Sequence, residues 1–241
     1  MTTTEFNDEF DIHYNSIAGQ SAPNIDLYEK SVYLTKAQLE LVKNYYDPSS
    51  NAKNTGFEAT EKRRVDLKEL KRRTEVTTFV ESTYGKLAFL PSELYLITRE
   101  DAIISSESFC NGKKLVDVKP VTTDEFNVQR RNPFKKPDRS VVWRLDHASI
   151  NTNNTVELVS EYPLDKYIVD YIMYPTPIIL TDLEEAFPGD HLTIDGHTAK
   201  TECILNQGIH REIIDRAVEL ALRDYNPQGL ESKIALDRRN E

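Results

Sequence analysis

The chain has 241 residues, of which 39% are hydrophobic and only 8 are glycine, a composition that is typical of a folded globular protein and argues against disorder. Its 40 acidic and 30 basic residues give a formal charge of −10, which opposes broad electrostatic attraction to nucleic acid. The two cysteines, Cys110 and Cys203, are too few for a disulfide framework, and no apolar run reaches the roughly 20 residues of a bilayer span.

The first forty-odd residues are expected to form two helices. Residues 1–20 lack the charged-then-apolar leader of a secreted protein, so we expect the chain in a reducing compartment. Phe6, Phe10 and Tyr14 recur at helical spacing behind capping threonines, which predicts a short helix. After a break at AGQSAPN, a broad apolar face predicts a longer helix over residues 26–46, which Pro48 ends.

We identify residues 61–73, EKRRVDLKELKRR, as the one strongly basic run of the sequence. It is open to two interpretations: a contact with DNA or an acidic partner surface, and a solvated, partly helical surface segment. Because no aromatic residue is interleaved with the charges, the solvated segment is favoured. The candidate contact residues are Lys62, Arg63, Arg64, Lys71, Arg72 and Arg73.

Residues 74–180 change to a period of two and to β-branched and aromatic side chains, which predicts strands joined as an antiparallel meander. The strongest local signal is AIISSESFCNGKKLVDVKPV. Asn111 and Gly112 within it are expected to form a two-residue type I′ hairpin turn, because both central positions of that turn need a positive φ.

Two further β elements are predicted before the chain returns to helix. Residues 140–163 contain two alternating runs around NTNN and predict a second hairpin. Residues 166–174 predict another strand with Tyr167 among its inward-facing residues. Pro175 and Pro177 then end the pairing or place this piece at a sheet edge.

The C-terminal part begins with the acidic stretch TDLEEAFPGD, which predicts a turn or a short helix. Residues 191–207 are expected to add a short strand pair, and residues 209–225 predict the last clear helix. We expect this helix to pack against residues 26–46, because the two carry the widest apolar helical faces of the chain. The residues expected to be buried by that contact are Val32, Leu39, Ile213 and Ala217.

These elements predict an α+β fold in which N- and C-terminal helices form one helical body around a long inserted antiparallel β-domain. The expected domains are an N-terminal helical part over residues 1–73, a β-rich insertion over residues 74–203, and a C-terminal helix and tail over residues 204–241 that complete the helical part. The tail from residue 229 has mixed charge and is expected to reach toward a neighbouring molecule.

A search for catalytic patterns finds no glycine-rich phosphate loop, no G-x-S-x-G elbow and no paired metal motif. The possible metal ligands are His191, His197, Cys203 and His210, but their spacing matches no common zinc pattern. Asp146, His147 and Ser149 cannot act as a triad, because neighbouring strand residues point to opposite faces. The acid pairs Asp124-Glu125 and Glu184-Glu185 are typical of solvated turns. We therefore expect no catalytic residue, metal or cofactor.

Several stretches across the chain resemble a known family. They include EFDIHYNSIAGQSAPNIDLYEKSVYLTKAQLELVKNYY, FLPSELYLI, PVTTDEFNVQRRNPFKKPDRSVVWRLD, YIVDYIMYPTPIIL and LTIDGHTAKTECILNQGIHREIIDRAVELALRD. The family is that of the ring-forming head-to-tail connector proteins, or neck adaptors, of crAss-like tailed phages.

The resemblance implies a structural virion protein of the neck and tail with an adaptor-like helical body, present in the host cytoplasm during assembly. The implied partners are further copies of the chain in a closed ring, implied to be a dodecamer, together with the portal protein and other neck or tail ring proteins. Genomic DNA would pass through the lumen without sequence-specific binding. No membrane contact and no catalytic residue are implied.

The candidate assembly contacts are Phe6, Phe10, Tyr14 and Tyr28. A helix of about three turns is not stable alone in water, so its aromatic rings need a covering surface. We expect that surface to belong to a neighbouring subunit more than to the chain's own core. Two other functions stay open: a nucleic-acid-binding or nuclease-like phage protein that uses residues 62–73, and another minor virion protein.

Overall fold

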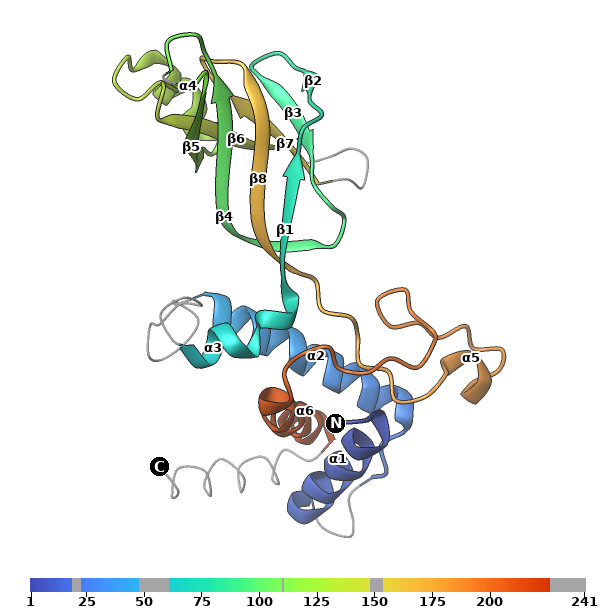
Figure 1. Cartoon of the computed structure of the whole chain (residues 1–241). Coiled ribbons are helices and arrows are strands. Elements are labelled where there is room, and N and C mark those ends of the chain that lie inside the picture. Colours follow the sequence, from blue (N-terminus) through green and yellow to red (C-terminus); the bar gives the residue numbers. More distant parts are fainter. Residues whose placement is uncertain (19–22, 48–60, 110, 148–153, 226–241) are drawn as a thin grey trace. The chain divides into compact units, whose positions relative to one another are not determined.

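The computed structural model describes residues 1–18, 23–47, 61–109, 111–147 and 154–225, and the chain divides into two compact units (Figure 1). The helical unit joins Met1–Leu70 to Pro175–Glu241. The sheet unit is Lys71–Tyr174, and it contains all strands of the described sheet. The chain is therefore α+β, as expected.

Within its described residues the helical unit holds three long helices, α1 (Thr3–Ala18), α2 (Leu27–Tyr46) and α6 (His210–Tyr225). The shorter elements are α3 (Glu61–Asp66), η3 (Lys68–Leu70), α5 (Leu183–Ala186) and η4 (Gln207–Ile209). The start of α2 is set by a capping box, because the side chains of Asp26 and Glu29 each accept the other's backbone N–H. The three long helices predicted from the sequence are confirmed.

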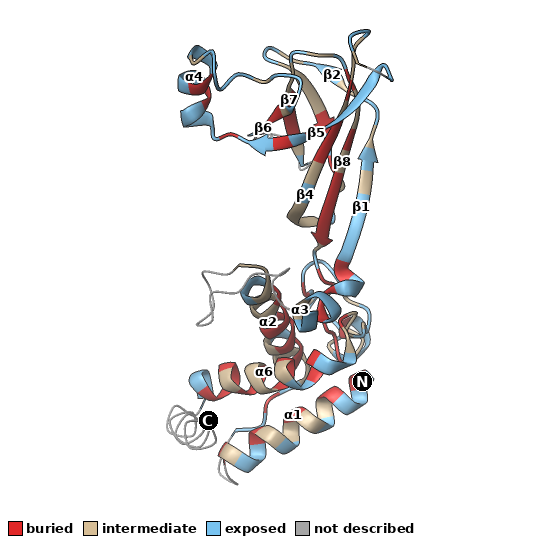
Figure 2. Cartoon of the chain, turned by 60° about the vertical axis from the view of Figure 1, so that its left-hand side comes forward, coloured by how far each residue is buried: buried red, intermediate tan, exposed pale blue. Residues whose placement is uncertain are grey.

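The long helices pack around α6, which contacts both α1 and α2. Ile213 and Ala217 of α6 are fully buried, and Figure 2 shows buried residues along all three helices. The Tyr45 hydroxyl of α2 also donates to Glu212 Oε2 of α6 at 2.6 Å. The predicted packing of the second helix against the last is confirmed.

The buried face of α2 is more polar than the sequence predicted. Ser31, Thr35 and Gln38 are buried, whereas Leu39 is only half-buried and Val32 is 36% exposed. The expected burial of Val32 and of Leu39 is therefore wrong. The helix is turned from its most apolar orientation because part of its inner face meets backbone atoms that need hydrogen-bond partners.

Those backbone atoms belong to residues 176–180, a segment outside the helices and named strands that follows the sheet unit in the chain. Three side chains of α2 replace the partners that a neighbouring strand would have offered. Ser31 Oγ accepts the backbone N–H of Leu180 at 3.0 Å, and Thr35 Oγ1 accepts that of Ile178 at 3.1 Å. Gln38 Nε2 donates to the carbonyl oxygen of Thr176 at 3.2 Å. α2 thereby holds the returning chain in place.

The sheet unit is built on an eight-stranded sheet with the order β1-β8-β4-β5-β6-β7-β3-β2. The strands are β1 (Lys71–Val76), β2 (Val80–Glu81), β3 (Lys86–Phe89), β4 (Leu94–Ser105), β5 (Lys113–Pro120), β6 (Val141–His147), β7 (Thr155–Val159) and β8 (Leu164–Met173). β5 and β6 are parallel and the other neighbours antiparallel, so the expected antiparallel meander is wrong. The cause is α4 (Thr123–Arg131), the crossover that returns the chain to the start of β6.

β8 is an interior strand, paired with β1 on one side and β4 on the other. Tyr167, Val169 and Tyr171 are buried, as the alternation predicted. The strand ends at Met173, before Pro175, so the expected end of pairing is confirmed.

The β4–β5 hairpin is present, but the turn that closes it is not the expected one. Ser105 pairs with Lys113, so seven residues connect the strands. Gly112, the second of the two turn residues proposed, has a positive φ of 69°. The two-residue type I′ turn at Asn111 and Gly112 is therefore wrong. The hairpin predicted over residues 140–163 is confirmed by the antiparallel pairing of β6 and β7.

A two-residue turn of this kind occurs instead in the helical unit. Asp195 and Gly196 have φ values of 49° and 79°, and their neighbours Ile194 and His197 exchange both backbone hydrogen bonds, at 3.0 and 2.9 Å. Together with the bridge between Ile179 and Thr201, this turn is the short strand pairing predicted after residue 191.

A buried ion pair crosses the interior of the sheet unit. Arg144 Nη1 of β6 donates to Glu100 Oε1 of β4 at 2.5 Å, and the side chains are 11% and 6% exposed. The Tyr167 hydroxyl of β8 donates to the same carboxylate oxygen. Burial, followed by the charge and hydrogen bond of Glu100, raises the pKa of Tyr167, so the hydroxyl keeps its proton. This network links three strands.

Replacing Glu100 with Gln should destabilise the sheet unit by about 3 kcal/mol or more, because it leaves the buried Arg144 guanidinium with only the 71% exposed carboxylate of Asp146 as a charged partner. Chemical denaturation followed by circular dichroism measures the loss. The matched control is Lys113→Met, which breaks the largely exposed pair with Asp165 and should cost about 1 kcal/mol or less. Equal effects of the two variants would contradict a special role for the buried pair.

Replacing Thr35 with Val should destabilise the helical unit by about 1–3 kcal/mol, because the buried N–H of Ile178 loses its acceptor while the volume is unchanged. Val32→Thr, on the exposed side of the same helix, serves as the control and should leave the melting temperature unchanged. Wild-type stability of Thr35→Val would show that the hydroxyl does not hold the returning segment.

Candidate functional site

The N-terminal aromatic residues lie in the chain's own core. Phe6 and Phe10 are fully buried and Tyr14 is 3% exposed. The Phe6 ring packs 5.1 Å from the ring of His210 at the start of α6. The expectation that a neighbouring subunit covers these rings is wrong for this conformation, because α6 of the same chain covers them. Their role in assembly stays a prediction.

Polar contacts also hold α1 against the rest of the helical unit. The Met1 ammonium donates to His210 Nδ1 at 3.2 Å, while Nε2 of the same ring lies 2.9 Å from the Leu205 carbonyl oxygen. Burial lowers the pKa of His210, which favours the neutral ring that this pattern requires. The buried ammonium of Lys30 pairs with Asp11 at 2.7 Å. α1 is thus part of the folded unit.

Tyr28, the fourth candidate assembly residue, occupies a different position. It is half-buried on the first turn of α2, and its ring packs edge-on against Phe187, with 6.4 Å between the ring centroids. Phe187 follows α5, so this pair borders the acidic stretch that the sequence analysis identified. Tyr28 therefore lies beside a charged surface segment rather than on the stripe of α1.

The basic run of residues 61–73 is divided between the two units and does not form one uniform surface. Lys62 pairs with Glu212 at 2.5 Å, and the Arg63 guanidinium lies 5.3 Å from the ring centroid of Tyr45. Arg73 pairs with Asp170 at 2.8 Å. Three of the six candidate residues are therefore engaged in contacts within the chain. The other three, Arg64, Lys71 and Arg72, are exposed.

The contact with Lys62 helps to lower the pKa of Glu212 on α6. Burial by itself would raise the pKa of Glu212, but the hydrogen bonds from Lys62 and Tyr45 outweigh that effect and lower it. The nearby carboxyl group of Asp66 is buried, which raises its pKa. Lys62 therefore stabilises a carboxylate of its own unit.

The candidate metal ligands and catalytic residues do not come together. Within the described ranges, no three His, Cys, Asp or Glu side chains are arranged to hold a metal ion. Burial raises the pKa of the Cys203 thiol to about 11, which disfavours the thiolate that zinc and nucleophilic catalysis both need. Asp146 pairs with Arg144 at 3.0 Å, and Ser149 lies outside the described residues. None of the described helices is both long and apolar enough to cross a bilayer.

Each of the two remaining acid pairs lies in the first turn of a helix. Asp124 and Glu125 lie in the first turn of α4, where carboxylates are favourable, and Glu125 also accepts a hydrogen bond from Gln129 at 2.7 Å. Glu184 and Glu185 occupy the first turn of α5, and both are exposed.

The most distinctive surface is one that the sequence analysis missed, the α4 lobe, defined as residues 122–140. Phe126 anchors the lobe by packing edge-on against Trp143, with 6.1 Å between the ring centroids. Beyond the helix, Phe134 is 96% exposed. The exposed basic residues around it are Arg130, Arg131, Lys135, Lys136 and Arg139. The sequence signal was RRNPFKKPDR, a second basic run, here with an interleaved aromatic residue.

Local hydrogen bonds hold the exposed end of the α4 lobe in one shape. The side chain of Asn132 accepts the backbone N–H of Phe134 at 3.0 Å. The side chain of Asp138 accepts the backbone N–H groups of Ser140 and Val141 at 2.7 and 3.1 Å. The loop thus presents Phe134 from a preorganised frame.

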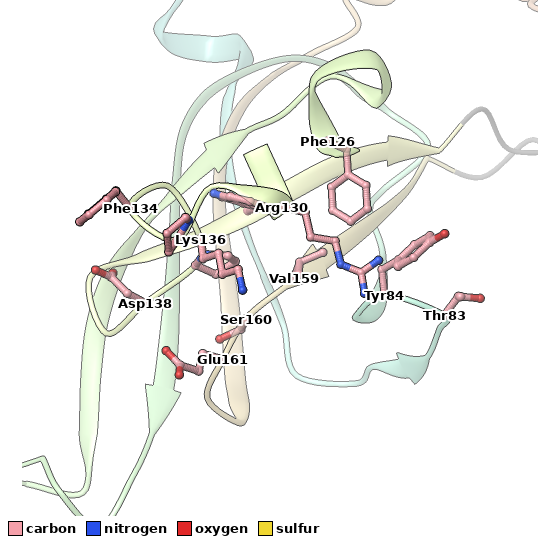
Figure 3. Close-up of a pocket in the computed structure, with 13 residues that line it drawn as sticks. Thr83, Tyr84, Phe126, Arg130, Phe134, Lys136, Asp138, Val159, Ser160 and Glu161 are labelled. Carbon is pink, nitrogen blue, oxygen red and sulfur yellow. The ribbon is translucent and has the colours of Figure 1, made fainter. Parts of the chain in front are cut away.

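A cavity of about 690 Å³ lies between the α4 lobe and the strands beneath it (Figure 3). Its wall combines aromatic rings with the guanidinium of Arg130, which lies 5.3 Å from the ring centroid of Tyr84. Lys136 and Asp138 line another part of the wall. The mixture of apolar and cationic groups fits a protein or anionic contact and shows no catalytic constellation.

Comparisons with known proteins agree with one another. Residues 1–233 match the family model described as phage tail ring protein 3/4. Ring protein 4/5 of Bacteroides phage crAss001 is 38% identical to this chain, with both proteins covered over 100% of their length. Ring protein 3 of the same phage is 36% identical, over 92% of this chain and 95% of that protein.

Replacing Phe10 with Ala should destabilise the helical unit by about 3–5 kcal/mol, because it leaves a cavity in a fully buried position of α1. Ile12→Ala, on the same helix at a site that is 67% exposed, is the control and should change stability by less than about 0.5 kcal/mol. Thermal unfolding measures both. A Phe10→Ala variant as stable as the control would show that α1 does not belong to the core in solution.

Proposed function

The chain belongs to the phage tail ring protein 3/4 family, and from this we propose that it forms a closed ring of identical subunits in the virion neck, between the portal and the tail. The observation that carries the proposal is the full-length similarity to two ring proteins of one phage. It is a structural component of the phage tail. The proposed ring is a dodecamer that lines the DNA passage and also contacts other ring proteins.

The architecture supports this role. Both ends of the chain build the helical unit, and the sheet unit is inserted between them, an arrangement that suits an adaptor-like body carrying an extra contact domain. A formal charge of −10 also suits a conduit, because a wall that bound phosphates tightly would hinder DNA movement. We propose that the protein has no catalytic activity and passes DNA without reading its sequence.

The alternative of a nuclease-like or DNA-binding protein that uses residues 62–73 receives less support. Lys62 and Arg73 form ion pairs within the chain, and Arg63 contacts an aromatic ring. A phosphate contact would have to break these interactions. We propose that this run contributes only secondarily to assembly.

Purified full-length protein, alone and with its portal protein, should give closed rings of twelve chains in native mass spectrometry and in electron-microscopy class averages. Arg64→Ala with Arg72→Ala, which removes two exposed residues of the basic run, should assemble as the wild type does. A chain that stays monomeric in the presence of the portal would overturn the proposed function. Metal-dependent cleavage of DNA by the pure protein would favour the nuclease-like alternative.

A further inference from the structure

We propose that the α4 lobe of one subunit docks on an acidic lobe of the next copy of the chain and that this contact forms the ring. The acidic lobe, called the α5 lobe, is residues 181–195. This inference rests on the proposed ring function and deepens it, because it names the two surfaces that meet.

The α4 lobe carries an unusual concentration of positive charge for such an acidic chain. Residues 130–139 contain five basic residues and one acidic residue. All five basic side chains are exposed, and none forms an ion pair with another described residue. In contrast, the basic run at residues 61–73 uses several of its charges internally. Arg130 packs against the Tyr84 ring, and the α4 lobe therefore keeps four of its five basic charges available for another surface.

Apolar groups at the same place indicate a protein contact. Phe134 is 96% exposed and Val128, on α4, is 71% exposed. Exposed aromatic residues framed by arginine are typical of the anchors that carry binding energy at protein interfaces. Because Asn132 and Asp138 already order the loop, docking would lose little conformational entropy.

The α5 lobe has the complementary charge. It contains five acidic residues and no lysine or arginine: Asp182, Glu184, Glu185, Asp190 and Asp195. Asp182 caps α5 by accepting the backbone N–H groups of Glu184 and Glu185, at 3.1 and 3.2 Å. Glu184, Glu185 and Asp190 are exposed.

The α5 lobe also has a fixed shape and an apolar centre. Leu183 and Ile194 of the lobe form a buried cluster with Ile179, and Phe187 and Leu192 of the lobe, together with Tyr28 of α2, are partly buried against it. The type I′ turn at Asp195 and Gly196 closes its far end. Acidic residues around half-buried aromatic rings match a basic lobe that carries an exposed phenylalanine.

A second copy fits these observations better than duplex DNA does. The two lobes are different surfaces on different units of one chain, so a contact between copies is heterologous and can be repeated until the ring closes. DNA phosphates would satisfy the basic residues but would give Phe134 no apolar partner. With the basic lobe set aside, the rest of the chain is even more acidic than the whole, so another copy supplies ample negative charge.

Charge reversal tests the contact. Lys135→Glu with Lys136→Glu, and separately Glu184→Lys with Glu185→Lys, should each lower ring formation about tenfold or more, because like charges would face each other. All four substitutions in one chain, or an equal mixture of the two variants, should restore rings. The control is Arg64→Glu with Lys68→Glu, which makes the same charge change at exposed residues elsewhere and should assemble normally.

Cross-linking tests which chain is contacted. A photoreactive benzoylphenylalanine at position 134, in a mixture of 15N-labelled and unlabelled subunits, should give hybrid cross-links to the peptide of residues 181–195. The same probe in place of Ile12 should not. Cross-links confined to one chain would overturn the proposal.

The outcomes separate this inference from the proposed function. If both charge-reversed variants still form rings as the wild type does, the proposed docking surfaces are wrong, but the proposed ring function is unaffected. Reversal at Lys135 and Lys136 that abolishes binding to duplex DNA, measured by fluorescence anisotropy, with rings intact would assign the α4 lobe to DNA. A wild-type chain that forms no ring with or without its portal would overturn both proposals.

Discussion

The fold depends on the way α2 holds the chain where it returns from the sheet unit. The chain leaves the helical unit after Leu70 and re-enters it at Pro175. The first residues after this return belong to no helix or named strand, and side chains of α2 supply hydrogen bonds to their backbone groups. Because these backbone groups have hydrogen-bond partners, the returning chain can lie against α2. α6 then packs against both α1 and α2, so residues from both ends of the sequence form one unit.

The sheet unit also buries polar groups, and there an ion pair supplies their partners. Glu100 and Arg144 come from strands that are not neighbours in the sheet, and Tyr167 completes their contact from a third strand. Such a buried pair adds little net stability compared with apolar residues, but it penalises any arrangement that leaves one partner alone. It therefore favours the observed strand order over alternatives of equal hydrophobic burial.

The proposed function rests on the similarity to ring proteins and on the exposed surfaces of the chain. Within the described residues no three potential ligands are arranged to hold a metal ion, and two exposed lobes carry opposite charge. For a protein of a ring family, opposite lobes on separate units are the simplest source of a repeating contact. The aromatic stripe of α1, in contrast, is used within the subunit.

The sequence by itself determined the local elements: the spacing of Phe6, Phe10 and Tyr14 predicted α1, the broad apolar face of residues 26–46 predicted α2, and the alternation along residues 166–174 predicted β8. Caps and periodicity act within a few residues, so they can be read directly. Only the tertiary structure decided which face of α2 is buried, that β5 and β6 pair in parallel, and that the type I′ turn forms at Asp195 and not at Asn111. These outcomes depend on partners distant in sequence, as does the choice of which basic residues stay exposed.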